Sequence, residues 1–273
     1  FAASEALERG LGVSKAGQDV DFNFSDLCEG DQTQFTDVTT VNSGTLSSWS
    51  WDFGDGIGNS TQQNPTYQYA SAGTYTVELV VTSSFGCKDS ITKNVTIAPP
   101  PTADAGADDD ICVGDNIQIG SAAVAGYSYA WDNAVTLSSA TVSDPTASPT
   151  TTTTYTVTVT ETATGCTNTD QVTITVNPLP TADAGADQAI CEGESTQIGS
   201  AAIAGNTYSW DNTSSLSSAS VANPRANPTT TTTYTVTVTE TATGCTNTDQ
   251  VTITVNDVPT ADFTFSDLCE GDQ

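Results

Sequence analysis

One stretch of sequence occurs twice without change, and it constrains the fold more than any other feature. The segment YTVTVTETATGCTNTDQVTITV spans residues 155–176 and returns at 234–255, with a looser version at 75–97. In both arms, apolar residues alternate with polar ones, which is the period of two expected of strands with one buried face. The Thr-Gly-Cys-Thr between the arms predicts a turn. The sequence therefore predicts a β-hairpin that recurs in tandem copies of one small β-domain.

The other marked residues keep a near-constant distance from this hairpin and divide the chain into repeats of about 80 residues. The predicted repeats span residues 19–99, 100–177 and 178–256. Residues 1–18 do not match the repeat, and we expect a lead-in that is either a short helix or the end of a preceding domain. Residues 257–273 contain DFTFSDLCEGDQ, which nearly repeats residues 21–32, so they predict the first strand of another copy of the first repeat.

The charge of the chain excludes several classes of partner. Five Lys and Arg stand against 33 Asp and Glu with no histidine, for a net charge of −28. Nucleic acid is excluded because phosphate binding needs clustered cations, and anionic membrane surfaces are disfavoured for the same reason. No apolar run approaches the length of a membrane span, so membrane insertion is not expected. The start lacks both a methionine and a signal peptide, so we expect it to be processed, truncated or internal.

Seven cysteines are spaced regularly, two in each repeat and one near the end. The spacing predicts one disulfide per repeat, namely Cys28–Cys87, Cys112–Cys166 and Cys191–Cys245, with Cys269 unpaired in this segment. Each bond would stabilise its repeat by about 4 kcal/mol on the chain-entropy model. Such a framework in a chain with few apolar residues predicts an oxidising, extracellular setting. A cysteine-based metal site is disfavoured because CxxC spacing and histidine are both missing.

A tryptophan lies between the two cysteines of each repeat, and a tyrosine begins each hairpin. These six residues are the predicted core: Trp51, Trp131, Trp210, Tyr75, Tyr155 and Tyr234. The alternative is a row of exposed aromatics that binds sugar, to which Trp49 would also belong. Packing is the favoured interpretation, because large aromatic residues dominate small cores.

Catalysis is not expected, so we predict that the chain is not an enzyme. Without histidine, Ser-His and Cys-His nucleophile pairs are impossible, and the cysteines are assigned to disulfides. Carboxylates next to the tryptophans, at Asp52, Asp132 and Asp211, could in principle act in pairs. We expect them instead to accept hydrogen bonds from backbone N–H groups of the following turn.

Acidic residues gather where one predicted repeat meets the next. Candidate Ca²⁺ ligands are Asp104, Asp108 and Asp110 before the second repeat, and Asp183 and Asp187 before the third. Carboxylate oxygens from adjacent loops suit Ca²⁺, which would stiffen a charged linker. The alternative is a solvated acidic linker without metal. No other cofactor is expected.

The first repeat resembles a known family. WDFGDG at residues 51–56, followed by NPTYQYASAGTYTVELVVTSSFGC at 64–87, resembles the signature of the PKD domain. The resemblance implies a seven-stranded β-sandwich similar in plan to the immunoglobulin fold. It also implies an extracellular spacer or interaction module without enzyme activity of its own.

The second and third repeats keep Trp-Asp but lose the following Gly-Asp-Gly. They resemble the immunoglobulin-like repeats that accompany PKD domains in giant surface adhesins of gliding bacteria, proteins exported by the type IX route. The resemblance implies an all-β fold of tandem seven-stranded sandwiches in a linear array. Asp89-Ser90-Ile91 resembles the O-glycosylation site of such bacteria, which makes Ser90 a candidate glycan site.

These observations favour a structural role on a bacterial cell surface. The predicted function is a stalk or filament segment of a long extracellular adhesin, whose partners are neighbouring repeats or filament copies and a surface polysaccharide. One alternative is a carbohydrate-binding accessory module of a secreted polysaccharide-degrading enzyme. The other is a self-assembling filament subunit in which residues 262–273 complete the sheet of a neighbouring chain.

Overall fold

A computed structural model of the chain describes residues 18–25 and 27–264. Of the predicted lead-in at residues 1–18, residues 1–17 lie outside the described residues, as does Cys269, and Gln18 belongs to a strand. Within these described ranges all regular elements are β-strands apart from two short 3₁₀ turns, η1 (Ala134–Thr136) and η2 (Thr213–Ser215), so the all-β prediction is confirmed. The described residues contain no helix long and apolar enough to cross a membrane.

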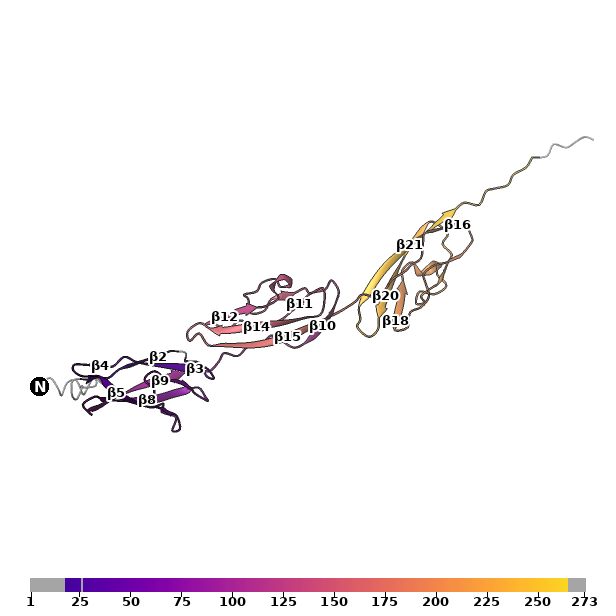
Figure 1. The fold of residues 1–273 in the computed structure, drawn as a ribbon. Helices are drawn as coiled ribbons and strands as arrows, with labels where there is room; N and C mark the ends of the chain where they lie inside the picture. Colours follow the sequence, from indigo (N-terminus) through magenta and orange to yellow (C-terminus); the bar gives the residue numbers. More distant parts are fainter. Residues whose placement is uncertain (1–17, 26, 265–273) are drawn as a thin grey trace, which may run out of the picture. The chain divides into compact units, whose positions relative to one another are not determined.

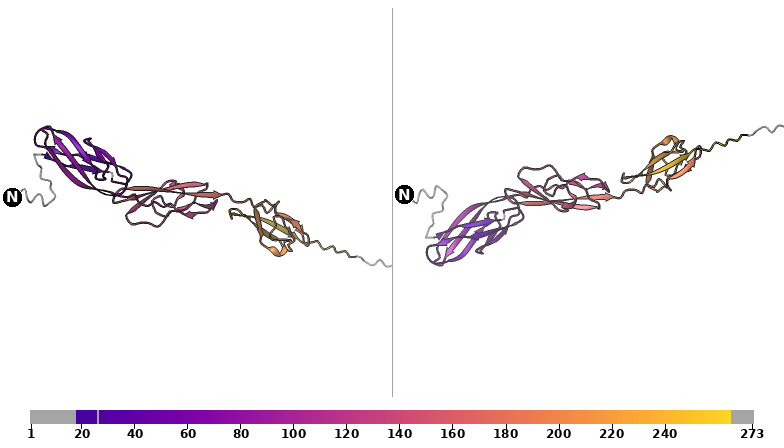
Figure 2. Two further views of the ribbon diagram at one scale, coloured as in Figure 1. Left: turned by 90° about the horizontal axis from the view of Figure 1, so that it is seen from below. Right: turned by 90° about the horizontal axis from the view of Figure 1, so that it is seen from above.

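The first repeat is a β-sandwich with a three-stranded sheet, β2-β3-β7, and a four-stranded sheet, β6-β5-β8-β9, next to the short pair β1-β4. Figures 1 and 2 show these strands in indigo to purple. The strands are β1 (Gln18–Asp19), β2 (Phe22–Ser25), β3 (Gln32–Asp37), β4 (Thr40–Val41), β5 (Leu46–Asp52), β6 (Asn59–Ser60), β7 (Thr66–Gln68), β8 (Gly73–Ser83) and β9 (Lys88–Ile97).

The core of the first repeat follows from alternation along its strands. On β8, Val77, Leu79 and Val81 are buried while their neighbours are more accessible. They pack with Phe35 of β3 and Trp51 of β5 in one cluster. Since every second side chain of a strand points to the same face, the apolar residues of the two sheets meet in the middle of the sandwich.

The second and third repeats share one topology. Each has a four-stranded sheet, β10-β15-β14-β12 or β16-β21-β20-β18, and a two-stranded sheet, β11-β13 or β17-β19. The bounds in the second repeat are β10 (Asp109–Cys112), β11 (Ile117–Gln118), β12 (Tyr127–Trp131), β13 (Thr146–Ala147), β14 (Thr153–Glu161) and β15 (Thr167–Asn177). In the third they are β16 (Gln188–Cys191), β17 (Thr196–Gln197), β18 (Asn206–Trp210), β19 (Arg225–Ala226), β20 (Thr232–Glu240) and β21 (Thr246–Asn256).

The predicted number of seven strands per repeat is wrong for the described residues. The first repeat has nine, β1 to β9, and the later repeats have six each. In the later repeats the segment after the tryptophan strand forms a 3₁₀ turn. Leu137 and Leu216 then make only isolated bridges, to Ala147 and Ala226, so this segment does not form a strand of its own.

The repeated hairpin is present as predicted. It consists of β14 and β15 in the second repeat (Figure 1) and of β20 and β21 in the third, where Tyr234 lies opposite Val251. In the second and third repeats the first strand, β10 or β16, pairs parallel to the last, β15 or β21, and the first repeat has an isolated parallel bridge at the same place. Cys112 lies opposite Asn177 and Cys191 opposite Asn256, while Cys28 forms a parallel bridge with Ala98. The first cysteine of each repeat therefore lies where the last strand ends.

By compactness the chain divides into two units. One comprises residues 1–107, 118–147 and 154–172, and the other comprises residues 108–117, 148–153 and 173–273. The division passes through the second repeat.

Candidate functional site at the junctions between repeats

Two disulfides join successive repeats. Cys28 of the first repeat bonds to Cys166 of the second, with 5.5 Å between their Cα atoms. Cys112 of the second repeat bonds to Cys245 of the third, with a Cα separation of 5.6 Å. Each bond lies within one of the two compact units. The predicted pairs Cys28–Cys87, Cys112–Cys166 and Cys191–Cys245 are therefore wrong.

The parallel pairing of the first and last strands explains the correction. Cys112 lies opposite Asn177, at the end of β15, whereas Cys166 lies directly before Thr167, at its beginning. β15 has 11 residues, so at about 3.3 Å per residue the two cysteines are roughly 36 Å apart. A disulfide needs Cα atoms within about 7 Å of each other. A bond within the repeat is impossible, and Cys166 and Cys245 bond instead to a cysteine of the preceding repeat.

The same hydrogen bonds hold the entering chain at both junctions. Asn168 Nδ2 donates to the Pro101 carbonyl at 3.0 Å, and Asn247 Nδ2 donates to the Pro180 carbonyl at 3.0 Å. Nearby, Asp170 Oδ2 accepts the Ala105 N–H at 2.8 Å, and Asp249 Oδ2 accepts the Ala184 N–H at 2.8 Å. The identical second arms of the two hairpins thus fix the linkers in the same way.

The predicted calcium ligands accept hydrogen bonds from the protein itself. Asp108 Oδ1 accepts the Thr173 N–H at 2.7 Å, and Asp187 Oδ1 accepts the Thr252 N–H at 2.8 Å. The partners of the others are the N–H of Gly106 for Asp104, the side-chain amide of Asn177 for Asp110 and the N–H of Gly185 for Asp183. Residues 18–25 and 27–264 contain no cluster of three or more potential ligands that could hold a metal. Calcium binding stays a prediction.

The three central tryptophans are buried, as predicted. Trp51, Trp131 and Trp210 are 1%, 5% and 3% exposed. Each indole N–H donates to a carbonyl 11 residues further on, at 2.9 Å: to Gln62, Val142 and Val221. The same hydrogen bond, at the same spacing in sequence, therefore occurs in all three repeats.

The remaining aromatic residues divide between the core and its edge. Tyr155 and Tyr234 are buried as predicted, whereas Tyr75 is only partly buried and its hydroxyl donates to the Ser71 carbonyl. Trp49 is also partly buried, and its indole N–H donates to Asp37 Oδ2 at 2.7 Å. The tryptophans therefore do not form an exposed row, which removes the main support for a sugar platform.

The WDFGDG motif builds a turn with little room for side chains. Asp52 Oδ1 accepts the Gly54 N–H at 2.9 Å, and Asp55 Oδ1 accepts the Gly58 N–H at 2.7 Å. The Tyr67 hydroxyl donates to the second oxygen of Asp55. Gly54 has a φ of +79°, and a Cβ there would lie 2.3 Å from the Thr76 carbonyl oxygen. The aspartates and glycines of the motif are thus required by the backbone conformation of the turn.

In the later repeats the aspartate after the tryptophan has a different partner. Asp132 Oδ1 accepts the N–H of Thr156, and Asp211 Oδ1 accepts that of Thr235, both at 2.7 Å. The expectation that they bind the following turn holds for Asp52 and is wrong for these two. The turn itself contains Asn133 or Asn212 at positive φ, a conformation that asparagine tolerates.

The pair Asp55–Tyr67 has shifted pKa values. Burial raises the pKa of the Asp55 carboxyl, but the hydrogen bonds from Tyr67, Gly58 and Ile57 outweigh it, so the net pKa lies below 3.8. The hydrogen bond to Asp55, together with burial, raises the pKa of Tyr67 to about 12. Asp55 therefore stabilises the fold above pH 3.8 and loses this contribution as the pH falls below it. The Tyr67 hydroxyl stabilises the fold below pH 10, and this contribution is lost as the pH rises towards 12.

Replacing Tyr67 by phenylalanine is expected to weaken the alkaline loss of stability of the first repeat. The variant should be less stable than the parent chain at pH 7, and the difference should shrink between pH 10 and pH 12, where the parent loses the tyrosine contribution. Urea unfolding monitored by fluorescence at pH 7, 10 and 11.5 measures this. Tyr75→Phe is the matched control, because its hydroxyl donates to a carbonyl rather than to a carboxylate. A constant difference at all three pH values would contradict the assignment.

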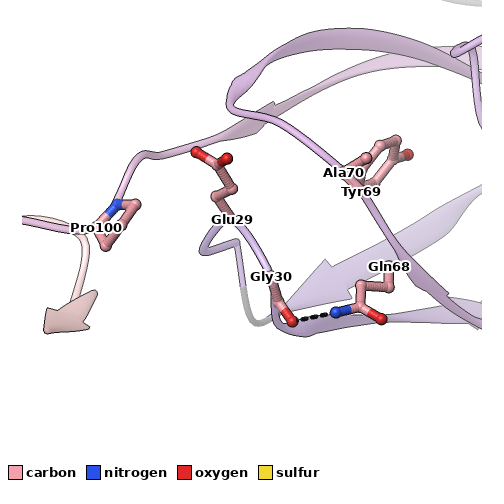
Figure 3. Close-up of a pocket in the computed structure, with 6 residues that line it drawn as sticks. All are labelled: Glu29, Gly30, Gln68, Tyr69, Ala70 and Pro100. Carbon is pink, nitrogen blue, oxygen red and sulfur yellow. Dashed lines mark hydrogen bonds between the residues drawn. The ribbon is translucent and has the colours of Figure 1, made fainter.

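A cavity of about 530 Å³ lies in the first repeat and extends to Pro100, the residue directly after it. Its lining residues are Glu29, Gly30, Gln68, Tyr69, Ala70 and Pro100 (Figure 3). Gln68 Nε2 donates to the Gly30 carbonyl across one side. Burial raises the pKa of Tyr69, whose hydroxyl donates to the Phe53 carbonyl at 3.0 Å. Glu29 is the only carboxylate among these six lining residues.

Comparison with known proteins supports the PKD prediction for the first repeat. The PKD domain family matches residues 19–99. Collagenase ColA of Bacillus cereus is 42% identical over 72 residues, which is 26% of this chain and 7% of that protein. Microbial collagenase of Vibrio alginolyticus is 47% identical over 60 residues, 22% of this chain and 7% of that protein. The chain thus spans only a small part of the curated relatives that it matches.

Two solved structures are similar to different extents of the chain. The PKD1 domain of Vibrio anguillarum Epp is 28% identical, covers 32% of this chain and 100% of its own, and has a TM-score of 0.29. The titin fragment I67–I69 is 11% identical, covers 89% of this chain and 100% of its own, and has a TM-score of 0.39. The prediction for the first repeat is confirmed: residues 19–99 match the PKD domain family, and two all-β repeats, each with a four-stranded and a two-stranded sheet, follow them.

Proposed function

We propose that this chain is a stalk segment of a long extracellular protein on a bacterial surface. The observation that carries the proposal is the pair of disulfides that joins each repeat to the next. A bond between repeats does little for the interior of either sandwich, but it limits how far the two can separate or bend. Such restriction is useful in a spacer that has to transmit force.

The charge and the sulfur chemistry support an extracellular place for this stalk. Disulfides persist in oxidising compartments, and a net charge of −28 keeps neighbouring copies apart. Within the proposal, the stalk is part of an adhesin of the gliding-bacterial type exported by the type IX route. Ser90, exposed on β9, could carry a glycan there, and calcium could bind at the linkers. Partners would be neighbouring repeats, filament copies and a surface polysaccharide.

Small-angle X-ray scattering tests the stalk directly. A compact globule of this length has a radius of gyration of about 19 Å. Three sandwiches of roughly 35 Å each, placed end to end, give about 30 Å or more. We expect the higher value in the oxidised protein. A radius near 19 Å would rule the stalk out.

A second candidate is an accessory region of a secreted enzyme. The local identity of this chain to two bacterial collagenases favours it. A carbohydrate-binding version of this role would use exposed aromatics, and the burial of the three central tryptophans argues against it. Isothermal titration with soluble polysaccharides distinguishes the two, because a pure spacer releases no binding heat. Strand exchange through residues 262–273 is a third candidate, which the mass of the particle in solution tests.

A further inference from the structure

The first cysteine of the third repeat has the same local structure as the two that form bonds between repeats. Cys191 lies opposite Asn256 as Cys112 lies opposite Asn177. The next residue donates its N–H to that asparagine carbonyl at 2.9 Å in both cases, from Glu192 and from Val113. The residue three positions after each cysteine donates back to the cysteine carbonyl, at 3.1 Å from Glu194 and 3.0 Å from Asp115.

Cys28 has the matching arrangement in the first repeat. The Glu29 N–H donates to the Ala98 carbonyl at 2.8 Å, and the Asp31 N–H donates to the Cys28 carbonyl at 3.1 Å. Three equivalent cysteines therefore have one backbone geometry. Two of them are bonded to a turn cysteine of the following repeat, and the third, Cys191, is exposed and reduced.

We propose that Cys191 forms a disulfide with the turn cysteine of a β-sandwich that follows the third repeat in the same polypeptide. The turn of a PKD domain is suited to this role. The Ser83 N–H donates to the Cys87 carbonyl at 2.8 Å, just as the N–H groups of Glu161 and Glu240 donate to those of Cys166 and Cys245 at 2.9 Å. A PKD turn thus presents its cysteine as the immunoglobulin-like turns do.

The sequence spacing agrees with this pairing. Asp262 begins a near copy of the segment that starts at Asp21. A sandwich continuing from Asp262 as the first repeat continues from Asp21 would place its turn cysteine about 137 positions after Cys191. The two bonds in the structure span 138 and 133 positions.

The bond forms by thiol–disulfide exchange with a small-molecule disulfide such as oxidised glutathione. The Cys191 thiolate attacks one sulfur of the oxidant and releases one glutathione thiolate. The turn thiolate then attacks the Cys191 sulfur of the mixed disulfide and releases the second. In sum, the two protein thiols lose two electrons and two protons, and one oxidised glutathione becomes two reduced molecules.

The experiment extends the full chain after Gln273 with a copy of residues 33–99, which completes a fourth sandwich. The copy of Phe85 in the extension is replaced by tyrosine, so that its turn peptide differs in mass from the one that contains Cys87. The protein is equilibrated in a glutathione redox buffer, alkylated, digested without reduction and analysed by mass spectrometry. We expect a peptide that links Cys191 to the added turn, and at least a tenfold fall in the alkylation of Cys191.

Two further proteins complete the design. In the extended chain with Cys191→Ser, the added turn cysteine should become alkylated. In a second extension, a copy of residues 178–256 follows Asn256 directly, which repeats an existing type of junction if the added PKD domain does not fold. The proposal is overturned if Cys191 stays alkylated in both extended chains. A bond from Cys191 to Cys269, or to a turn of a second molecule, also overturns it. The scattering experiment is independent of these outcomes, so a negative result for the Cys191 disulfide does not contradict the proposal of a stalk.

Discussion

Reduction of the two disulfides is expected to lengthen the fully extended chain from roughly 380 Å to roughly 960 Å, at about 3.5 Å per residue. With both bonds intact, tension between the ends does not follow the whole backbone. The shortest covalent path runs to Cys28, crosses to Cys166, returns along the chain to Cys112, crosses to Cys245 and continues to the end. This path contains only about 110 residues, and the rest of the backbone carries no load.

Single-molecule pulling measures both lengths, before and after addition of a reductant, with other thiols alkylated. The control variant is Cys191→Ser, which should leave the oxidised length unchanged because Cys191 is outside both bonds. Disulfides within each repeat would behave differently. Removing Cys191 would then open a loop of about 54 residues and add roughly 190 Å. That lengthening would contradict the bonding between repeats.

Replacing Gly54 by alanine is expected to destabilise the PKD domain by about 3–5 kcal/mol. The new Cβ would lie 2.3 Å from the Thr76 carbonyl oxygen, and the φ of +79° is already unfavourable for alanine. The backbone of β8 would have to move, which would disturb the pairing of Glu78 with Asp52. A loss of this size is a large part of the stability of a small domain.

Gly56→Ala is the matched control for this substitution. Gly56 has a similar φ of +83°, but a Cβ there meets no atom within 4 Å. It should cost about 1 kcal/mol, which is the conformational term alone. Hydrogen exchange of the β5 and β8 amides, followed by mass spectrometry, measures both losses within this domain. Equal protection in the two variants would show that the steric contact with Thr76 is unimportant.

Much of the fold could be predicted from the sequence because the repeated hairpin has a clear period of two. The alternation places Tyr155 and Val157 on the buried face, and both are buried. The PKD motif located the first domain, since its glycines and aspartates are required by one tight turn. The number of strands could not be predicted, because the segments around Leu137 and Leu216 make bridges too short to show a period.

The disulfide pairing could not be predicted from the sequence, because cysteines that are close in sequence are not the ones that are close in space. Cys112 and Cys166 are nearer in sequence than Cys112 and Cys245, but a strand of 11 residues separates them. The sequence did contain a relevant signal. The last strand begins at the turn and ends where the chain leaves the repeat, so the turn cysteine has to lie away from the exit. The parallel pairing that puts Cys112 at the exit has no such local signature.

The two bonds overlap along the chain, since Cys112 lies between Cys28 and Cys166. A single proteolytic cut at any peptide bond from Cys28 to Cys245 therefore leaves both fragments tethered by at least one sulfur bridge. If each disulfide were confined to a single repeat, a cut in the segment between two repeats would separate the fragments. The interlaced arrangement makes the connecting peptides, which proteases reach most easily, tolerant of nicking in a protease-rich environment.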